Sequence, residues 1–108
     1  MADFSLKQND TWPPLNATLT DANGPIDLTA ATGVKLILAP TGGGATIVNA
    51  ACTIVSAVAG TVRYTWTTGD TTTIGTFKGE FEITWTGGKI GTVPNEGYFT
   101  VEILDDLG

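Results

Sequence analysis

Few residues of this chain could carry out acid–base or nucleophilic chemistry. The 108-residue sequence contains no histidine and a single cysteine, Cys52. A cysteine nucleophile needs a neighbouring base, usually histidine, so Cys52 lacks its ordinary partner. The run Ala51-Cys52-Thr53-Ile54 favours a different interpretation, in which the thiol is a small buried hydrophobic group. A single cysteine also cannot form a disulfide within the chain.

Paired carboxylates are the other candidates for catalysis. Glu80 and Glu82 lie two residues apart, and Asp105 precedes Asp106 near the end of the sequence. Residues two apart on a strand share a face, so we expect Glu80 and Glu82 side by side in water, with Lys78 nearby. Nothing in the sequence indicates that either group is desolvated, so a solvated face is favoured over a catalytic pair. We therefore predict no catalytic residue and no enzyme.

Metal and phosphate sites have little support either. Without histidine and with one cysteine, the sequence excludes a structural zinc site. Asp21-Ala22-Asn23-Gly24 comes nearest to a calcium loop but lacks the other ligands. It is interpreted as a turn in which Asp21 and Asn23 bond their own backbone. The glycine runs at 42–44 and 87–88 precede no predicted helix and are interpreted as turns. We expect neither a metal nor a cofactor.

Apolar residues alternate with polar ones at five places, a period of two that is typical of strands with one buried face. The apolar sets are Leu15, Ala17 and Leu19; Val34, Leu36 and Leu38; Val62, Tyr64 and Trp66; Phe77, Gly79, Phe81, Ile83 and Trp85; and Phe99, Val101 and Ile103. Turn sequences separate these runs, and Thr86-Gly87-Gly88-Lys89 predicts a tight hairpin. The chain is therefore predicted to be all-β, an antiparallel β-sandwich of roughly seven to nine short strands in one domain covering residues 1–108.

The same alternation predicts which side chains fill the core. Those expected to be buried are Leu36, Tyr64, Phe81, Ile83, Trp85 and Val101. Because proline cannot donate to a β-ladder, the first strand must break at Pro13 and Pro14 or lie at the edge of a sheet. We expect the chain to pair with one sheet through Phe4 and Leu6, to break at the prolines, and to join the other sheet at Leu15.

Trp12, beside the prolines, has two interpretations. It could plug one end of the core, or it could be an exposed anchor for a partner. The plug is favoured because a small domain needs its aromatic residues inside. If the protein acts by contact, the first segment and the glycine loop are the best candidate surfaces. The candidate partner contacts are Lys7, Gln8, Asn9, Asp10, Trp12, Gly42, Gly43 and Gly44.

The balance of charge limits the classes of partner. Eleven acidic and five basic residues give a formal net charge of −6, and the basic residues are scattered along the sequence. Nucleic acids and anionic membranes are bound by clustered lysine and arginine, so we expect neither partner. No apolar run approaches the ~20 residues that cross a bilayer, and no signal peptide opens the chain. We expect a soluble protein.

Several short motifs resemble a family of tailed-phage proteins. They are Phe4-Ser5-Leu6-Lys7-Gln8-Asn9-Asp10-Thr11, Pro14-Leu15-Asn16-Ala17-Thr18-Leu19, Asp21-Ala22-Asn23-Gly24 and Asp27-Leu28-Thr29, with further matches within 59–64, 70–77, 80–83 and 94–98. Together they are similar to the N-terminal, immunoglobulin-like domain of phage baseplate upper proteins. The resemblance implies an immunoglobulin-like sandwich and a non-enzymatic virion structural protein. It would dock on tail or baseplate subunits, in multiple symmetric copies, after synthesis in the host cytoplasm.

Two alternatives stay open. In baseplate upper proteins further segments follow this domain, whereas this sequence ends at Gly108. A lone acidic sandwich also resembles capsid (head) decoration proteins. A carbohydrate-binding module is the other alternative, and it would need two or more of Trp12, Trp66 and Trp85 coplanar on the surface. The alternation puts Trp66 and Trp85 on apolar faces, which makes this alternative less favourable.

Overall fold

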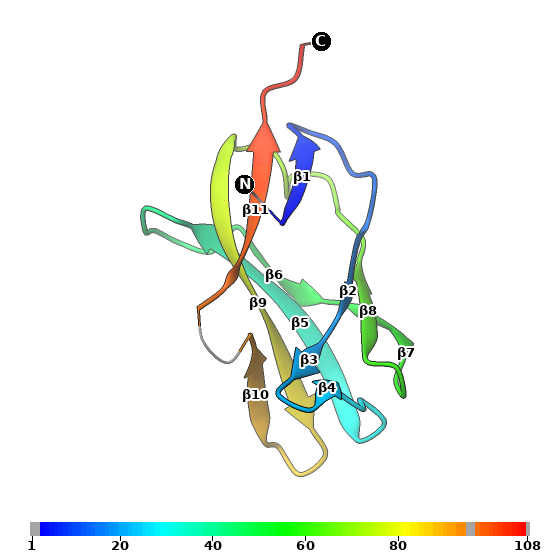
Figure 1. Cartoon of the computed structure of the whole chain (residues 1–108). Coiled ribbons are helices and arrows are strands. Elements are labelled where there is room, and N and C mark those ends of the chain that lie inside the picture. The colour runs from blue at the N-terminus through cyan, green and yellow to red at the C-terminus, as the bar shows by residue number, and fades with distance from the viewer. Residues whose placement is uncertain (1–2, 95–96, 108) are drawn as a thin grey trace.

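The computed structural model describes residues 3–94 and 97–107, which form eleven strands (Figure 1). They are β1 (Phe4–Lys7), β2 (Leu15–Thr18), β3 (Thr20–Asp21), β4 (Gly24–Pro25), β5 (Ala31–Pro40), β6 (Val48–Ala51), β7 (Thr53–Ser56), β8 (Thr61–Tyr64), β9 (Gly75–Trp85), β10 (Ile90–Val93) and β11 (Phe99–Leu104). Roughly seven to nine strands were predicted, and the two beyond that number are the short strands β3 and β4, which form a two-residue ladder around the Ala22-Asn23 turn. The described residues include no helix long and apolar enough to span a membrane.

Two sheets face each other and enclose the core. The strand order is β1-β11-β9-β5-β6 in the larger sheet and β2-β8-β7 in the smaller one. The long strand β9 pairs with β5 on one side, whereas β11 and β10 pair with the first and second halves of its other side. All described pairings are antiparallel except that of β1 with β11. The predicted all-β, antiparallel sandwich is confirmed, with one parallel pair at its edge.

The chain crosses between the sheets at the predicted place. β1 pairs with β11 in the larger sheet and β2 pairs with β8 in the smaller one, so the prolines lie in the crossover. Leu6 and Leu15, on either side of the break, are both buried. A second crossover needs one residue only, because Cys52 alone separates β6 from β7. Its N–H donates to the carbonyl oxygen of Val34 at 2.8 Å.

Side chains assigned to the core by the alternation are buried, with one exception. Leu36, Tyr64, Phe81, Ile83 and Val101 are each at most 4% exposed. Trp85 is only half-buried, contrary to prediction. It is the last residue of β9, and it lines a cavity with Asp21 and Ile26. The indole ring thus packs against the core with only part of its surface.

The predicted hairpin connects β9 to β10. The Trp85 N–H donates to the Lys89 carbonyl oxygen at 2.7 Å, and the Gly88 N–H donates back to the Trp85 carbonyl oxygen at 2.9 Å. The ladder then continues from Thr84 opposite Ile90. This confirms the hairpin predicted from the two consecutive glycines.

Gly60, immediately before β8, approaches the backbone of other segments closely. It is buried and has φ of 73°. A Cβ atom placed there would lie 2.5 Å from the Ile26 carbonyl oxygen and 3.1 Å from that of Leu19. Only glycine fits this position, because both the space and the dihedral angle exclude a side chain.

Candidate partner-binding surfaces

The crossover segment, residues 8–14, carries the most exposed tryptophan. Trp12 is 76% exposed, so its interpretation as a plug is wrong. The core at this end is closed instead by Trp66, which is 3% exposed. The Trp66 ring stacks on Phe4 with 5.9 Å between centroids and meets the Tyr64 ring edge-on at 5.1 Å. Because Trp66 fills this place, Trp12 stays outside.

Hydrogen bonds to distant parts of the chain fix the start of the crossover segment. The Gln8 N–H donates to the Leu104 carbonyl oxygen at 2.7 Å, and its side-chain amide donates to the Thr72 carbonyl oxygen at 2.8 Å. The Asn9 N–H donates to the Thr71 carbonyl oxygen at 3.0 Å. Gln8 and Asn9, predicted as partner contacts, therefore use these groups within the protein.

Thr71 holds the next residue of the segment. It is 1% exposed, and its hydroxyl donates to the Asp10 carbonyl oxygen at 2.8 Å. The Asp10 N–H in turn donates to the Lys7 carbonyl oxygen at 3.1 Å, which closes a turn. The side chains of Lys7 and Asp10 are exposed, and the Lys7 ammonium makes one long hydrogen bond, to the Asp105 carbonyl oxygen at 3.5 Å. Thr71 could not be identified from the sequence, because its role depends on a contact across 61 residues.

The loop that carries Thr71, residues 65–74, is itself fixed by a carboxylate. One Asp70 oxygen accepts the Tyr64 hydroxyl at 2.6 Å and both the N–H and the hydroxyl of Thr67, at 2.8 and 3.1 Å. Burial and the neighbouring Asp70 carboxylate raise the pKa of Tyr64 well above its usual range. Tyr64 thus remains a hydroxyl donor at neutral pH and holds the loop against which the crossover segment rests.

Trp12 belongs to a small apolar surface at this end of the molecule. With Pro13 and Leu104 it borders a shallow hollow of about 290 Å³ that also reaches Lys7 and Asp10. Leu104 is 37% exposed. Because hydrogen bonds already fix residues 8–10, the segment that leads to Trp12 need not be ordered when the ring binds a partner. This surface therefore has the chemistry of an anchor for a protein partner.

The glycine loop, Gly42 to Gly44, lies between β5 and β6 and is fully on the surface. The Gly43 N–H donates to the Pro40 carbonyl oxygen at 3.1 Å, as expected for a turn. Figure 1 shows this loop and the crossover segment on opposite sides of the molecule. The structure does not bring the two predicted contact regions together, so a single partner surface cannot include both.

Glu80 and Glu82 lie on the outer face of β9, partly exposed, and alternate with buried core residues. Lys35 on β5 is directly opposite Glu82, and Lys78 lies on the same strand face. The Lys78 ammonium is 5.8 Å from the centroid of the Tyr98 ring. The partly exposed glutamates with Lys78 beside them agree with the solvated face that the sequence predicts.

The Asp21 turn also forms as expected. An Asp21 carboxylate oxygen accepts the N–H of Asn23 at 2.8 Å, whereas the described structure gives no such bond from the Asn23 side chain. In residues 3–94 and 97–107, no three potential ligands among Asp, Glu and Cys gather as they would around a metal ion.

Cys52 is half-buried at the crossover between β6 and β7. Removal from water disfavours the thiolate, and burial raises the pKa of Cys52 to about 11. The packing thus agrees with the interpretation of Cys52 as a small hydrophobic group.

At pH 8 the thiol should react with iodoacetamide more than about 100-fold slower in the folded protein than in denaturant, because only the thiolate attacks. The rate in the folded protein should rise with pH and reach half of its maximum at about pH 11, where the group is half ionised. Mass spectrometry of quenched samples measures both rates. Equal labelling of folded and denatured protein at pH 8 would contradict the burial of this thiol.

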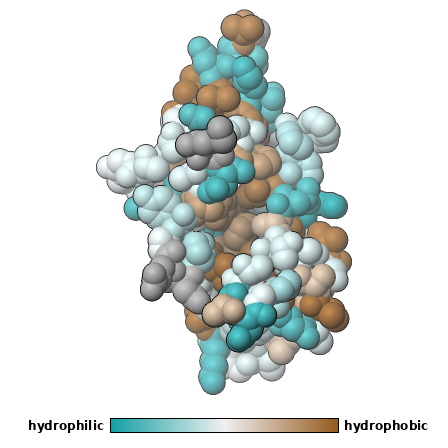
Figure 2. All heavy atoms as spheres, viewed as in Figure 1, coloured by the Kyte–Doolittle hydropathy of each residue, from teal (hydrophilic) through white to brown (hydrophobic). Residues whose placement is uncertain are grey.

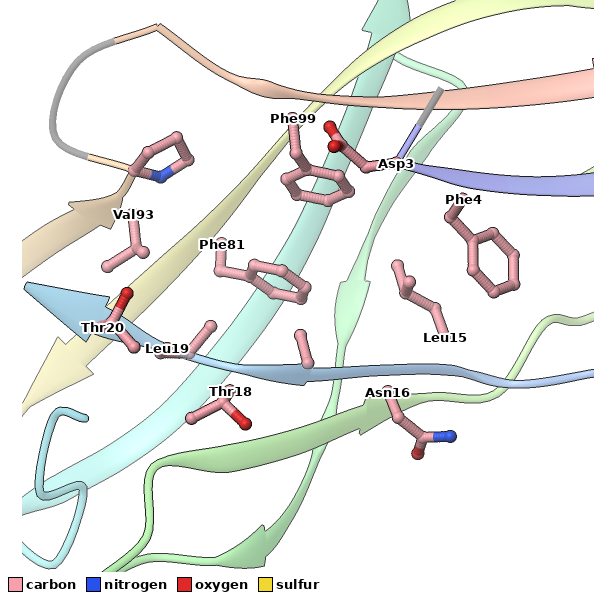
Figure 3. A pocket seen from close by; sticks show the side chains of 12 residues that line it. Asp3, Phe4, Leu15, Asn16, Thr18, Leu19, Thr20, Phe81, Val93 and Phe99 are labelled. Atoms are coloured by element: carbon pink, nitrogen blue, oxygen red, sulfur yellow. The ribbon is translucent and has the colours of Figure 1, made fainter. Parts of the chain in front are cut away.

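A groove on the open side of the sandwich was not predicted. A cavity of about 310 Å³ lies between β2 and the larger sheet, and Figure 2 shows apolar residues in the hollow on this face. Phe81 and Phe99 stack at its floor with 5.1 Å between ring centroids, while Leu15, Leu19 and Val93 form its walls (Figure 3). The alternation places these residues inward but does not indicate that this side lacks a covering strand.

No model of a known protein family matches the chain, and a search of curated proteins finds no related sequence. The resemblance to phage baseplate proteins therefore rests on the motifs quoted above.

Proposed function

We propose that this protein is a non-enzymatic structural protein of a tailed-phage virion. In this proposal it is an immunoglobulin-like docking module that binds tail or baseplate subunits. The observation that carries the proposal is the exposure of Trp12 on a crossover segment fixed by hydrogen bonds to the 65–74 loop and to β11. The motifs shared with baseplate upper proteins supply the class of partner.

The chemistry of the surface supports docking to a protein. Tryptophan is among the residues that most often dominate the energy of protein interfaces, and Trp12 has Pro13 and Leu104 beside it. The glycine loop on the opposite side offers a second, separate contact. Two contacts on opposite sides suit a subunit that touches different neighbours in a symmetric array. The protein would then be made in the host cytoplasm and incorporated in multiple copies.

Burial of the tryptophans argues against a carbohydrate-binding module. Such a module presents flat aromatic rings side by side, but Trp66 is 3% exposed and Trp85 is half-buried. Of the three tryptophans, Trp12 alone is largely exposed, at 76%.

The proposal predicts that Trp12→Ala lowers incorporation into particles. Loss of an interface anchor costs about 2 kcal/mol or more, which reduces occupancy about 30-fold where binding is not saturated. The measurement is the amount of protein that co-sediments with particles of a phage encoding the chain. Val58→Ala is the matched control, because Val58 is 75% exposed but lies in the β7–β8 turn.

Both variants should keep the circular dichroism spectrum of the parent protein. Normal incorporation of Trp12→Ala would place the contact elsewhere, and absence of the unaltered protein from particles would defeat the whole proposal. Separation of tails from heads before sedimentation distinguishes the tail and baseplate location from capsid decoration.

A further inference from the structure

One edge of the smaller sheet has backbone groups without partners. The Leu19 N–H donates to the Gly60 carbonyl oxygen at 2.8 Å, which continues the β2–β8 register by one residue. In an antiparallel ladder every second residue bonds to the neighbouring strand, so Ala17 faces β8 while Asn16 and Thr18 face away. Within the described residues, no hydrogen bond reaches the N–H or carbonyl group of Asn16 or Thr18 from this free side.

This free edge borders the cavity described above, called here the β2 groove. Leu15 and Leu19 point from the β2 segment toward Phe81 and Phe99, as Figure 3 shows. An extended peptide binds through its backbone hydrogen-bonding groups and through its apolar side chains. The free edge offers unpaired donors and acceptors for the first, and the apolar β2 groove offers space for the second. The backbone of such a peptide would pair with the edge of β2, and every second side chain would enter the β2 groove. A compact small molecule would leave the edge groups unpaired.

The charges around the β2 groove indicate the character of the peptide. Asp3 lies at one end, where its carboxylate accepts the Thr100 N–H at 2.9 Å. Asp21 borders the adjoining cavity, which shares Val93 with the groove. Among the described residues that line either cavity, none is lysine or arginine. The nearest cation at the edge is Arg63, whose Nε donates to the side-chain oxygen of Asn16 at 2.8 Å, outside the groove lining. The carboxylates of Asp3 and Asp21 therefore complement basic residues near the ends of a bound segment, whereas a second copy of this chain would bring the same carboxylates and a net charge of −6.

We propose that the β2 groove binds an extended segment of another protein as an added strand on the edge of β2. The segment has apolar residues at alternate positions and lysine or arginine near its ends. This site lies apart from Trp12 and does not depend on the phage assignment.

A displayed library of random peptides of about nine residues, long enough for one strand, tests the proposal. Selection on the purified protein should enrich alternating apolar sequences with basic residues. A fluorescent synthetic copy of the most enriched peptide then gives affinities by anisotropy. Thr18→Pro should weaken binding at least about tenfold, because it removes an edge N–H that β8 does not use. Thr18→Val keeps that N–H and should bind within about twofold of the parent protein.

Hydrogen exchange on the unaltered protein provides a measurement that does not depend on the proline variant folding. The Asn16 and Thr18 amides should exchange rapidly in the free protein and slow down when the peptide binds. The proposal is overturned by selection of no alternating peptide, by unchanged exchange at both amides, or by equal affinity for a folded Thr18→Pro variant. Formation of a dimer that Thr18→Pro abolishes would assign the edge to a second copy and overturn it as well.

Discussion

Replacement of Phe81 by alanine is expected to lower the free energy of unfolding by about 3–5 kcal/mol. Phe81 is 4% exposed, lies opposite Leu36 in the β5–β9 ladder and stacks on Phe99. The substitution removes the free energy gained by burying the phenyl ring, and it leaves a cavity beside the β2 groove. A domain with a total stability of ~5–15 kcal/mol would come close to unfolding.

Urea denaturation followed by circular dichroism measures this loss. Val55→Ala is the control, since Val55 is also on a strand but is 51% exposed, and its loss should stay within about 0.5–1 kcal/mol. A difference below about 1 kcal/mol between Phe81→Ala and the parent protein would mean that this strand does not face the core as described.

Gly60→Ala is expected to destabilise the protein by about 2–4 kcal/mol. A left-handed backbone costs a non-glycine residue about 1–2 kcal/mol, and the new methyl group adds a collision with the Ile26 carbonyl oxygen. Neighbouring backbone must move, which weakens the bond from the Leu19 N–H to the Gly60 carbonyl oxygen. Equilibrium denaturation gives the difference.

Gly97→Ala separates the two contributions. Gly97 has φ of 70°, close to the 73° of Gly60, but a Cβ atom there would meet nothing within 4 Å. It should show the backbone cost of about 1–2 kcal/mol without the collision. If both variants lose the same stability, the close approach of Gly60 to Ile26 is refuted.

The framework of the fold could be predicted because its signals are local. Alternation identified the buried faces of β5, β8, β9 and β11, and two consecutive glycines identified the β9–β10 hairpin. Pro13 and Pro14 located the crossover, since neither can donate to a ladder. These features depend on neighbours within a few residues, so the sequence displays them directly.

The error on Trp12 has a tertiary cause. The preference of aromatic residues for the interior applies equally to Trp12 and Trp66, and the core at this end holds one of them. Trp66 continues the inward face of β8, two residues beyond Tyr64, and so fills that place. Trp85 was predicted to be buried but is only half-buried. The alternation shows to which face of β9 its side chain points, but not how much of the ring other residues cover at the end of the strand.

The candidate surfaces were predicted only in part. The exposure of Lys7 and Asp10 follows from the polar sequence, but the bonds of Gln8 and Asn9 to residues 71 and 72 join segments more than 60 residues apart. The β2 groove could not be predicted for a similar reason. The alternation in a strand predicts which side chains face the core, but it does not indicate whether another strand pairs with each of its two edges.

The parallel pairing of β1 with β11 has a mechanical consequence. Because the two strands run in the same direction, the start of β1 and the end of β11 lie at opposite ends of their shared ladder. Tension that pulls the two ends of the chain apart acts along the strands and shears the four register pairs, Phe4–Val101 to Lys7–Leu104, together. An antiparallel terminal hairpin would open one pair at a time instead. The sandwich therefore resists stretching through its ends better than peeling from its side.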